Sequence, residues 1–394
     1  MNVTPLALHS ARAVRDTLCG HGWEVGQAAL AAAGIHPLAF HVTGVDQEAL
    51  EVLVRVAGNL GLEVVTGDGW AVLAGSRSRL GAFARPWLVP EVLAPVAVAI
   101  GRTMPPPPAP QPPDSWHTAR GPLRLDRPVL IGILNVTPDS FSDGGRFFDR
   151  SAAVTHAEAM LEAGAAVIDV GGESTRPGRT EVVDADEEIR RVVPIVEALG
   201  RAFPALIISV DTVKAAVAAA ALDAGAAVVN DVSGLRLDAS MAETVATRNA
   251  GLIAMHSRGS LLELASDAHA EYGGDVVGAV LTELGAAVSK ATAAGVSDES
   301  IVVDPGFGFS KTVEHNLELL DRLESLRALG RPILVGPSRK RFLGAVTGLP
   351  VEERDRATAT ACAFAWERGA RLFRVHAVAA AREALAVAGA VQGW

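Results

Sequence analysis

The chain has 394 residues, a formal net charge of −10 and a hydrophobic content of 49%. This length suggests about two or three domains, and this hydrophobic content excludes extensive disorder. The negative charge and the aromatic content of only 5% argue against a nucleic-acid partner. The two cysteines, Cys19 and Cys362, give neither a disulfide framework nor a metal cluster. With no basic segment followed by an apolar run near Met1, we expect a cytoplasmic protein that does not bind membranes.

Residues 1–103 have a mixed pattern. Residues 37–43 alternate like a strand, residues 46–59 have helical spacing behind the capping residue Asp46, and residues 62–65 and 70–73 flank a Gly-Asp-Gly turn. This order predicts a small α+β domain of ferredoxin-like type. Because it contains no cluster of titratable side chains, we expect an accessory domain; a small-molecule regulatory domain is the alternative.

A proline-rich segment follows the N-terminal part. Residues 104–114 read MPPPPAPQPPD, a composition typical of an extended polyproline spacer. We therefore expect residues 104–118 to be a linker. A docking site for a proline-binding module is the alternative.

Residues 119–394 show a regular alternation. Ala-rich segments with helical periodicity separate eight short apolar runs: 129–136, 167–171, 206–210, 227–229, 252–255, 301–303, 333–335 and 372–375. Continuous apolar strands that alternate with helices indicate a parallel sheet buried on both faces. Eight such units predict a (β/α)8 TIM barrel. A doubly wound open sheet is the competitor, but it should have a glycine fingerprint after its first strand, and the sequence has none there.

Polar residues follow these predicted strands. They are Asn135, Glu173, Asp211, Asn230 with Asp231, His256, Asp304, Ser338 to Lys340, and Arg374 with His376. In a barrel the carboxyl ends of the strands meet around one opening, where catalytic residues lie. A single polar residue there often only caps the next helix, but eight together predict an enzyme.

The rim residues fall into two chemical groups. Asp211, Asn230 and Asp304 suit the N–H edge of a nitrogen-rich heterocycle. The cations Arg339, Lys340, Arg374 and His376 suit phosphate, although residues 339–341 could also be a solvated basic turn. Asn135 could give an oxygen to Mg2+, which often bridges diphosphates.

Several motifs identify a family. Residues 132–145 (GILNVTPDSFSDGG) and 169–178 (DVGGESTRPG) are similar to the first two signatures of the dihydropteroate synthases. Shorter motifs follow in that family's order: SVDT at 209–212, NDVSG at 230–234, DPGFGF at 304–309, PSRK at 337–340 and RVH at 374–376. The resemblance covers about residues 125–390. It implies the condensation of 6-hydroxymethyl-7,8-dihydropterin diphosphate with 4-aminobenzoate in folate synthesis.

The resemblance also implies a role for individual residues. The pterin would be bound by Asp211, Asn230, Met255, Asp304 and Lys340. The diphosphate would be bound by Asn135, Arg176, Arg374 and His376, with Mg2+ on Asn135. Phe141, Thr175, Pro177 and Ser338 would frame the aminobenzoate, and Asp304, Lys340 and Asp143 would be catalytic. The resemblance further implies a homodimer, and the two Gly- and Ser-rich loops at 140–145 and 174–179 are expected to be mobile lids.

The sequence departs from the family pattern at two positions. Ser257 stands where the family more often has Met, and Ala377 replaces an Asp that usually follows the histidine. If that Asp orients the ring, its loss affects the tautomer of His376. A pterin-binding methyltransferase domain and a non-catalytic pterin-binding paralogue are the alternative functions.

Overall fold

The computed structural model describes residues 2–5, 38–75, 77–103, 113–137, 150–173 and 181–391. The chain divides into two compact units, Met1–Pro108 and Ala109–Trp394.

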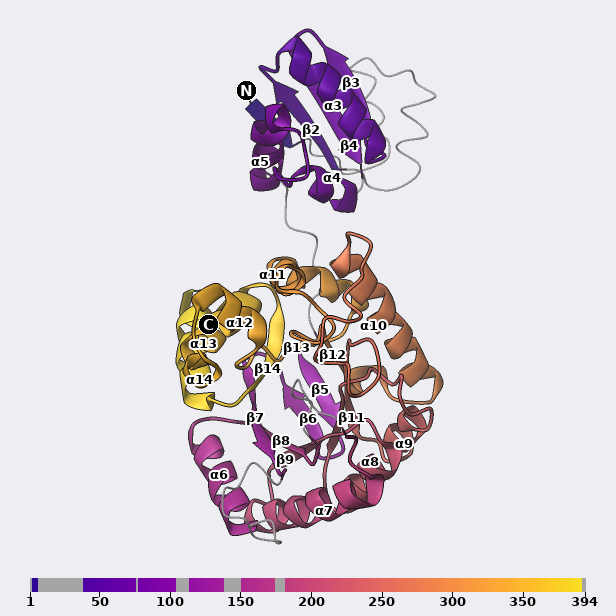
Figure 1. Cartoon of the computed structure of the whole chain (residues 1–394), viewed down its shortest axis with the longest axis vertical. Helices are drawn as coiled ribbons and strands as arrows, with labels where there is room; N and C mark the ends of the chain where they lie inside the picture. The colour runs from indigo at the N-terminus through magenta and orange to yellow at the C-terminus, as the bar shows by residue number, and fades with distance from the viewer. Residues whose placement is uncertain are drawn as a thin grey trace. The chain divides into compact units, whose positions relative to one another are not determined.

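The N-terminal unit is an antiparallel sheet packed against helices (Figure 1). Its strands β1 (Asn2–Pro5), β2 (Leu38–Thr43), β3 (Glu63–Gly67) and β4 (Trp70–Gly75) lie in the order β1-β2-β4-β3. The helices are α3 (Gln47–Asn59), α4 (Arg77–Phe83), η1 (Glu91–Leu93) and α5 (Ala94–Thr103). Asp46 caps α3, as predicted, by accepting a 2.8 Å hydrogen bond from the Ala49 N–H.

The predicted β-α-β-β-α order is present, with one difference from the ferredoxin-like arrangement. There, the edge strand beside the first strand follows the second helix. Here β1, from the start of the chain, occupies that edge and pairs antiparallel with β2.

The second unit is a closed barrel of eight parallel strands surrounded by helices (Figure 1), which confirms the predicted fold class. The strands are β7 (Val129–Asn135), β8 (Val167–Gly171), β9 (Ile207–Asp211), β10 (Val228–Asp231), β11 (Gly251–Met255), β12 (Ile301–Asp304), β13 (Ile333–Val335) and β14 (Ala370–Val375). Pairing of β14 with β7 closes the sheet, with Leu372 opposite Val129. Most strand residues are buried because the helices cover the outer face and side chains fill the interior.

Nine helices lie around the barrel in the described part of the chain. They are α6 (Arg150–Glu162), α7 (Ala185–Ala202), α8 (Ala215–Asp223), α9 (Met241–Thr247), α10 (Val276–Ala293), α11 (Val313–Asp321), α12 (Arg341–Thr347), α13 (Asp355–Glu367) and α14 (Val378–Val391). Short 3-10 turns lie at η3 (Asp298–Ser300), η4 (Leu323–Leu329) and η5 (Val351–Glu353). Within the described ranges, α10 alone is long and apolar enough to cross a membrane. One of its faces is buried, through residues that include Val280 and Leu284.

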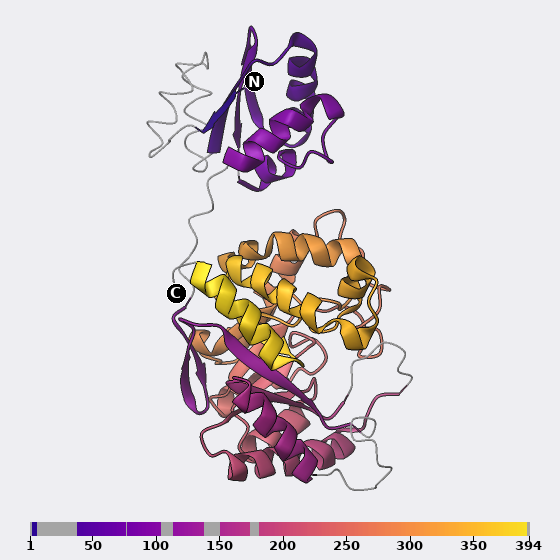
Figure 2. The ribbon, with the colours of Figure 1, turned by 90° about the vertical axis from the view of Figure 1, so that its left-hand side faces the viewer.

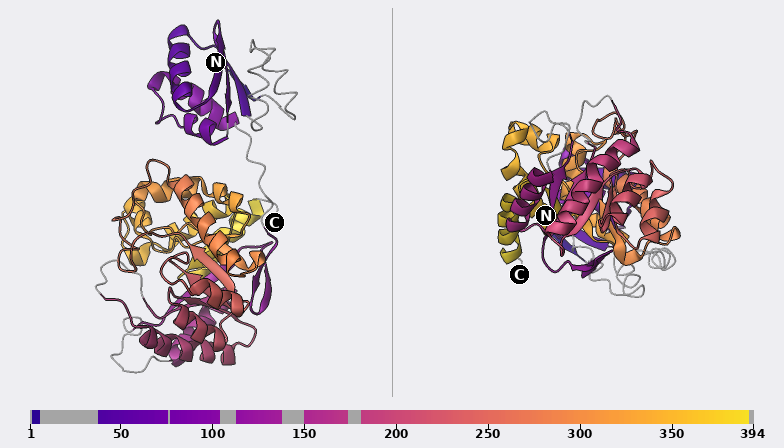
Figure 3. Two further views of the ribbon diagram at one scale, coloured as in Figure 1. Left: turned by 90° about the vertical axis from the view of Figure 1, so that its right-hand side faces the viewer. Right: turned by 90° about the horizontal axis from the view of Figure 1, so that it is seen from below.

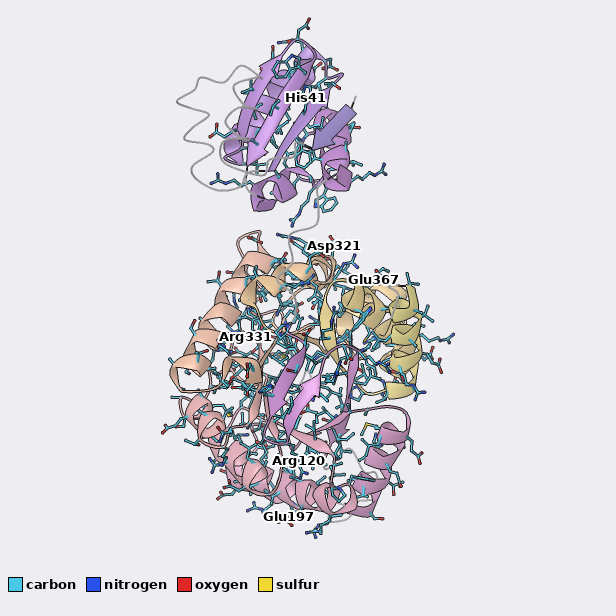
Figure 4. The ribbon with its side chains drawn as sticks, turned by 180° about the vertical axis from the view of Figure 1, so that it is seen from behind. His41, Arg120, Glu197, Asp321, Arg331 and Glu367 are labelled. Atoms are coloured by element: carbon cyan, nitrogen blue, oxygen red, sulfur yellow. The ribbon has the colours of Figure 1, made fainter. Side chains whose placement is uncertain are left out.

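A hairpin covers the amino-terminal end of the barrel and corrects the predicted linker. Its strands are β5 (Ser115–Thr118) and β6 (Gly121–Arg124), and Figures 2 and 3 show it at one end of the barrel. Trp116 is fully buried in the core inside the barrel, and its Nε1 donates to Ser300 O at 2.9 Å. Arg120, labelled in Figure 4, donates from the hairpin turn to Pro204 O. Residues 115–118 are therefore part of the barrel unit, because the Trp116 side chain is buried among the apolar side chains inside the barrel.

Candidate active site

A cavity of about 520 Å³ opens at the carboxyl ends of the strands. This volume is in the range of small-molecule sites. Its polar wall includes side chains from five strand ends: Asn135, Glu173, Asp211, Ser338 with Lys340, and Arg374 with His376. The structure thus brings together most of the predicted rim residues that it describes.

Arg374 joins two acids at the centre of this wall. Its Nε donates to Asp169 Oδ2 and its Nη2 to Asp211 Oδ2, both at 2.6 Å. Asn230 Nδ2 donates to the same Asp169 oxygen at 3.1 Å. Burial tends to lower the pKa of Arg374, but Asp169 and Asp211 raise it above its ordinary value, so this guanidinium is a permanent cation. Nη1 has no hydrogen-bond partner among the described residues and remains for a ligand.

The acids that are predicted to bind the pterin are buried. Burial raises the pKa of Asp211 to about 7, against the opposing effect of the Arg374 charge. Burial also raises the pKa of Asp304 to about 6, although the Gly306 N–H, which donates to Oδ1 at 2.7 Å, and Lys340 oppose it. Both carboxyl groups therefore titrate close to neutral pH, and each can accept from a heterocycle once it is ionised.

Lys340 lies at the mouth of the cavity. Its Nζ is 3.7 Å from the centroid of the Phe309 ring, a cation–π contact. Burial lowers the pKa of Lys340 to about 7, and the Arg374 charge lowers it further. Met255 is buried below, in an apolar cluster with Val213, Val232, Leu264 and Phe309. Asn230, Met255 and Asp304 are buried and are not among the residues that line the cavity.

His376 is oriented by a hydroxyl group. The Ser338 Oγ lies 2.9 Å from His376 Nδ1 and accepts from the His376 backbone N–H at 3.1 Å. The usual Asp is replaced by Ala377, and Ser338 provides an orienting contact from the neighbouring strand end. Ser338, predicted to frame the aminobenzoate, is thus also placed to position the histidine. At the other departure, the Ser257 Oγ is buried and donates to Val232 O at 2.7 Å.

Some predicted rim residues have structural partners instead. Arg339, in the left-handed backbone region at φ 56°, makes a two-point ion pair with Asp355 at 2.7 and 2.8 Å. Arg339 lines the cavity, and this pair with Asp355 occupies two of its donor nitrogens, Nε and Nη2. Asp231 accepts from the Ser233 and Leu235 N–H groups and stabilises its own loop. Glu173 binds Lys214 and accepts from the Val183 N–H at 2.7 Å.

The predicted metal site consists of one protein oxygen. A Cβ atom placed on Gly171 would lie 3.5 Å from Asn135 Oδ1 and 3.9 Å from Asp211 Oδ2, so the missing side chain leaves space beside both groups. Within the described ranges, no group of three or more His, Cys, Asp or Glu side chains could hold a metal ion. This donor set suits Mg2+ that arrives with a diphosphate and keeps several waters.

Five predicted site residues lie outside the described residues. They are Phe141 and Asp143 in the first signature loop, and Thr175, Arg176 and Pro177 in the second. The prediction that these loops are mobile lids also falls there. It stays a prediction.

Sequence reasoning missed two polar clusters. Asp169 interrupts the apolar run at 167–170, and that interruption was the available signal. Lys214 contacts Glu173 and Glu188, and Glu188 is fully buried on α7; burial raises its pKa, against the hydrogen bond from Lys214. Nothing in the local sequence joins Lys214, which lies between β9 and α8, to Glu173 and Glu188, which come from the preceding unit of β8 and α7.

A parallel barrel with buried acids and cations gathered at the carboxyl ends of its strands defines a TIM-barrel enzyme. The family model described as "Pterin binding enzyme" matches residues 131–376. The dihydropteroate synthase of Mycobacterium leprae (strain TN) is 48% identical over 267 residues, which are 66% of this chain and 92% of that protein. That of Bacillus subtilis (strain 168) is 42% identical over 253 residues, 64% of this chain and 85% of that protein.

Solved structures agree. The Xanthomonas albilineans dihydropteroate synthase with 4-aminobenzoic acid has a TM-score of 0.66 and 43% identity, covering 71% of this chain and 99% of its own. The same enzyme with 7,8-dihydropteroate has a TM-score of 0.63 and 41% identity, covering 71% and 99%. The chain belongs to the pterin-binding enzyme family, within which it is a member of the dihydropteroate synthases. This confirms the resemblance on which the sequence analysis relied.

Proposed function

We propose that this chain condenses 6-hydroxymethyl-7,8-dihydropterin diphosphate with 4-aminobenzoate to give 7,8-dihydropteroate and diphosphate. The observation that carries the proposal is the cavity in which Asp211 lies beside Arg374, Lys340 and His376. Heterocycle acceptors and phosphate donors thereby share one pocket. The relatives whose structures contain 4-aminobenzoic acid and 7,8-dihydropteroate support the first as a substrate and the second as the product.

The pterin ring would be bound by buried polar and apolar side chains near the carboxyl ends of the strands. Ionised Asp211 and Asp304 can accept from its N–H groups, Asn230 can donate and accept, and Met255 gives an apolar contact. Lys340 can donate to a ring acceptor. The fixed pairing of Arg374 with Asp211 aligns this carboxylate before the pterin binds, which lowers the ordering cost of binding.

The diphosphate would be held by Arg374 Nη1 and His376, with Asn135 binding Mg2+ beside it. The metal supplies charge neutralisation to the leaving group. Arg176 of the second signature loop would complete this half. Because Asp169 and Asp211 neutralise part of the Arg374 charge, the guanidinium can bind diphosphate and still release it as product.

The reaction begins when the methylene C–O bond breaks and its electron pair leaves with the diphosphate. The resulting pterin-methylene cation is stabilised by the nearby Asp304 carboxylate. The arylamine lone pair then forms the C–N bond, and the acidic anilinium nitrogen that results loses a proton to water. An arylamine is unprotonated at neutral pH, so no strong general base is required. Phe141, Thr175, Pro177 and Ser338 would orient the aminobenzoate, with Asp143 and Lys340 acting in catalysis.

The test is diphosphate release from the pterin diphosphate by the purified full chain, with and without 4-aminobenzoate. We expect release that depends on 4-aminobenzoate, and dihydropteroate as product. Pterin binding without turnover would support the non-catalytic paralogue. Methyl transfer from a methylated pterin in its place would support the methyltransferase alternative.

We also propose a cytoplasmic homodimer. The cytoplasmic prediction rests on the composition and cysteine usage of the sequence. The homodimer rests on the family resemblance. Light scattering of the full chain tests the oligomeric state.

A further inference from the structure

Lys311 is a buried lysine outside the predicted site. Its side chain is among the largest fully buried ones, and no ion pair joins it to a carboxylate among the described residues. Its Nζ lies 2.9 Å from His256 Nδ1, and donates to Phe309 O at 3.0 Å and Gly306 O at 3.1 Å. A buried ammonium is costly unless it is fully hydrogen-bonded, so this position needs an explanation.

The two carbonyl groups belong to the turn that follows Asp304. In this turn the Gly306 N–H donates to Asp304 Oδ1 at 2.7 Å, and the Phe309 ring makes the cation–π contact with Lys340 Nζ. Gly306 has φ +69°, and a Cβ there would lie 2.0 Å from His256 O, so the turn is pressed against β11. Lys311 therefore fixes the turn through which both Asp304 and Lys340 are placed.

His256 completes a chain of contacts behind this turn, where β11 and β12 lie side by side (Figure 1). Its Nε2 lies 3.0 Å from Glu283 Oε2, and Arg258 also pairs with Glu283. The Glu283 carboxylate accepts a hydrogen bond from the Nε2–H of the neutral ring, which leaves Nδ1 as the acceptor for Lys311. Burial, together with the Lys311 charge, lowers the pKa of His256 to about 4, so this ring is neutral in the working range.

Charged groups reach Lys311 from several elements. Burial lowers the pKa of Lys311 to about 7, while Asp304 and Glu283 oppose the shift and Arg258 and Lys340 increase it. Asp304 in turn is stabilised in its ionised form by Lys340, Lys311 and Arg374. Lys311 and Asp304 are thus electrically coupled, with Lys311 behind the pterin side of the site.

We propose that Lys311 is a positioning residue of the pterin site: it holds the 304–309 turn and supplies a positive charge behind Asp304. The proposal rests on the proposed function for the identity of the ligand. A lysine that only supports the fold would affect stability without changing the pH dependence of pterin binding. Because Lys311 carries a charge, the pH dependence of pterin binding distinguishes the positioning role from a purely structural one.

The experiment measures binding of 6-hydroxymethylpterin by calorimetry across pH for the full chain and its Lys311→Met variant. The control is Lys290→Met, which removes a lysine on α10 whose Nζ also donates to a backbone carbonyl, Leu235 O, in a partly buried hydrogen bond. We expect Lys311→Met to weaken binding about tenfold or more, and to move the acid-side midpoint upward by about 0.5 pH unit or more. A folded Lys311→Met that matches Lys290→Met in affinity and midpoint would overturn the proposal.

A second variant keeps the test decisive if Lys311→Met does not fold. Glu283→Gln removes a half-exposed anion that favours protonated Lys311. We expect the alkaline-side midpoint of pterin binding to move to lower pH, because Lys311 then loses its proton earlier. An unmoved midpoint would overturn the proposal. Binding is measured without turnover, so failure of the diphosphate-release assay would count against the proposed function and not against this one.

Discussion

Replacing Asp169 by Asn tests how the buried acids hold Arg374. Asp169 Oδ2 accepts both the Arg374 Nε and the Asn230 Nδ2, while Oδ1 is buried without a partner among the described residues. In the variant, the amide oxygen can occupy the Oδ2 position and keep both hydrogen bonds. The amide NH2 group must then lie where Oδ1 was, with no acceptor.

Two costs follow. A charge-assisted hydrogen bond becomes a neutral one, which costs about 1 kcal/mol, and a buried amide donor without a partner costs about 1–3 kcal/mol. The total of about 2–4 kcal/mol is below the range for a fully broken buried pair, because Arg374 keeps Asp211. Since a neutral amide holds the Arg374 guanidinium less strongly than a carboxylate does, we also expect kcat/KM for the pterin diphosphate to fall about tenfold or more.

The measurements are urea denaturation and steady-state kinetics of the full chain. The matched control is Asp223→Asn, which makes the same change in an exposed two-point pair with Arg248. We expect no measurable change in its denaturation midpoint or its kinetics. Equal midpoints and equal kinetics for the two variants would refute the assignment of Asp169 as the anchor of Arg374.

Four further predictions concern the site and the barrel. Activity should rise through about pH 6 to 7 as Asp304 and Asp211 ionise, and fall above about pH 7 as Lys340 and Lys311 lose their protons. In Lys340→Arg the part of the fall that belongs to Lys340 should move upward, and an unmoved fall would assign it to Lys311 alone. EDTA should abolish turnover and excess Mg2+ should restore it; full activity in EDTA would exclude the metal. Asp211→Asn should weaken pterin binding by about tenfold or more, measured by calorimetry, and an unchanged affinity would make Asp211 a structural partner of Arg374 only. A shortened chain that begins at Pro113 should keep kcat within about threefold of the full chain. A chain that begins at Pro122 also loses Trp116, and its free energy of unfolding should fall by about 3–5 kcal/mol. A hundredfold loss of kcat in a folded chain that begins at Pro113 would show that the N-terminal unit takes part in catalysis.

The sequence by itself determined the barrel and most of its rim. Parallel strands that are covered on both faces must be apolar along their length, and helices between them must have helical periodicity, so both elements can be recognised locally. A polar residue directly after such a run lies at the rim by geometry alone. This is why Asp211 and His376, each directly after an apolar run, could be named before their surroundings were known, whereas Asp169, inside a run, was overlooked.

Only the tertiary structure decided how these side chains are paired. Arg339 and Arg374 were both predicted at the rim and both line the cavity, but Arg339 is paired with Asp355 while Arg374 lies between two acids. Trp116 stands next to a proline-rich segment and looked like part of a linker, although it fills the closed end of the barrel. Such pairings join residues that are distant in sequence, so their energies depend on burial and distance that no local pattern contains.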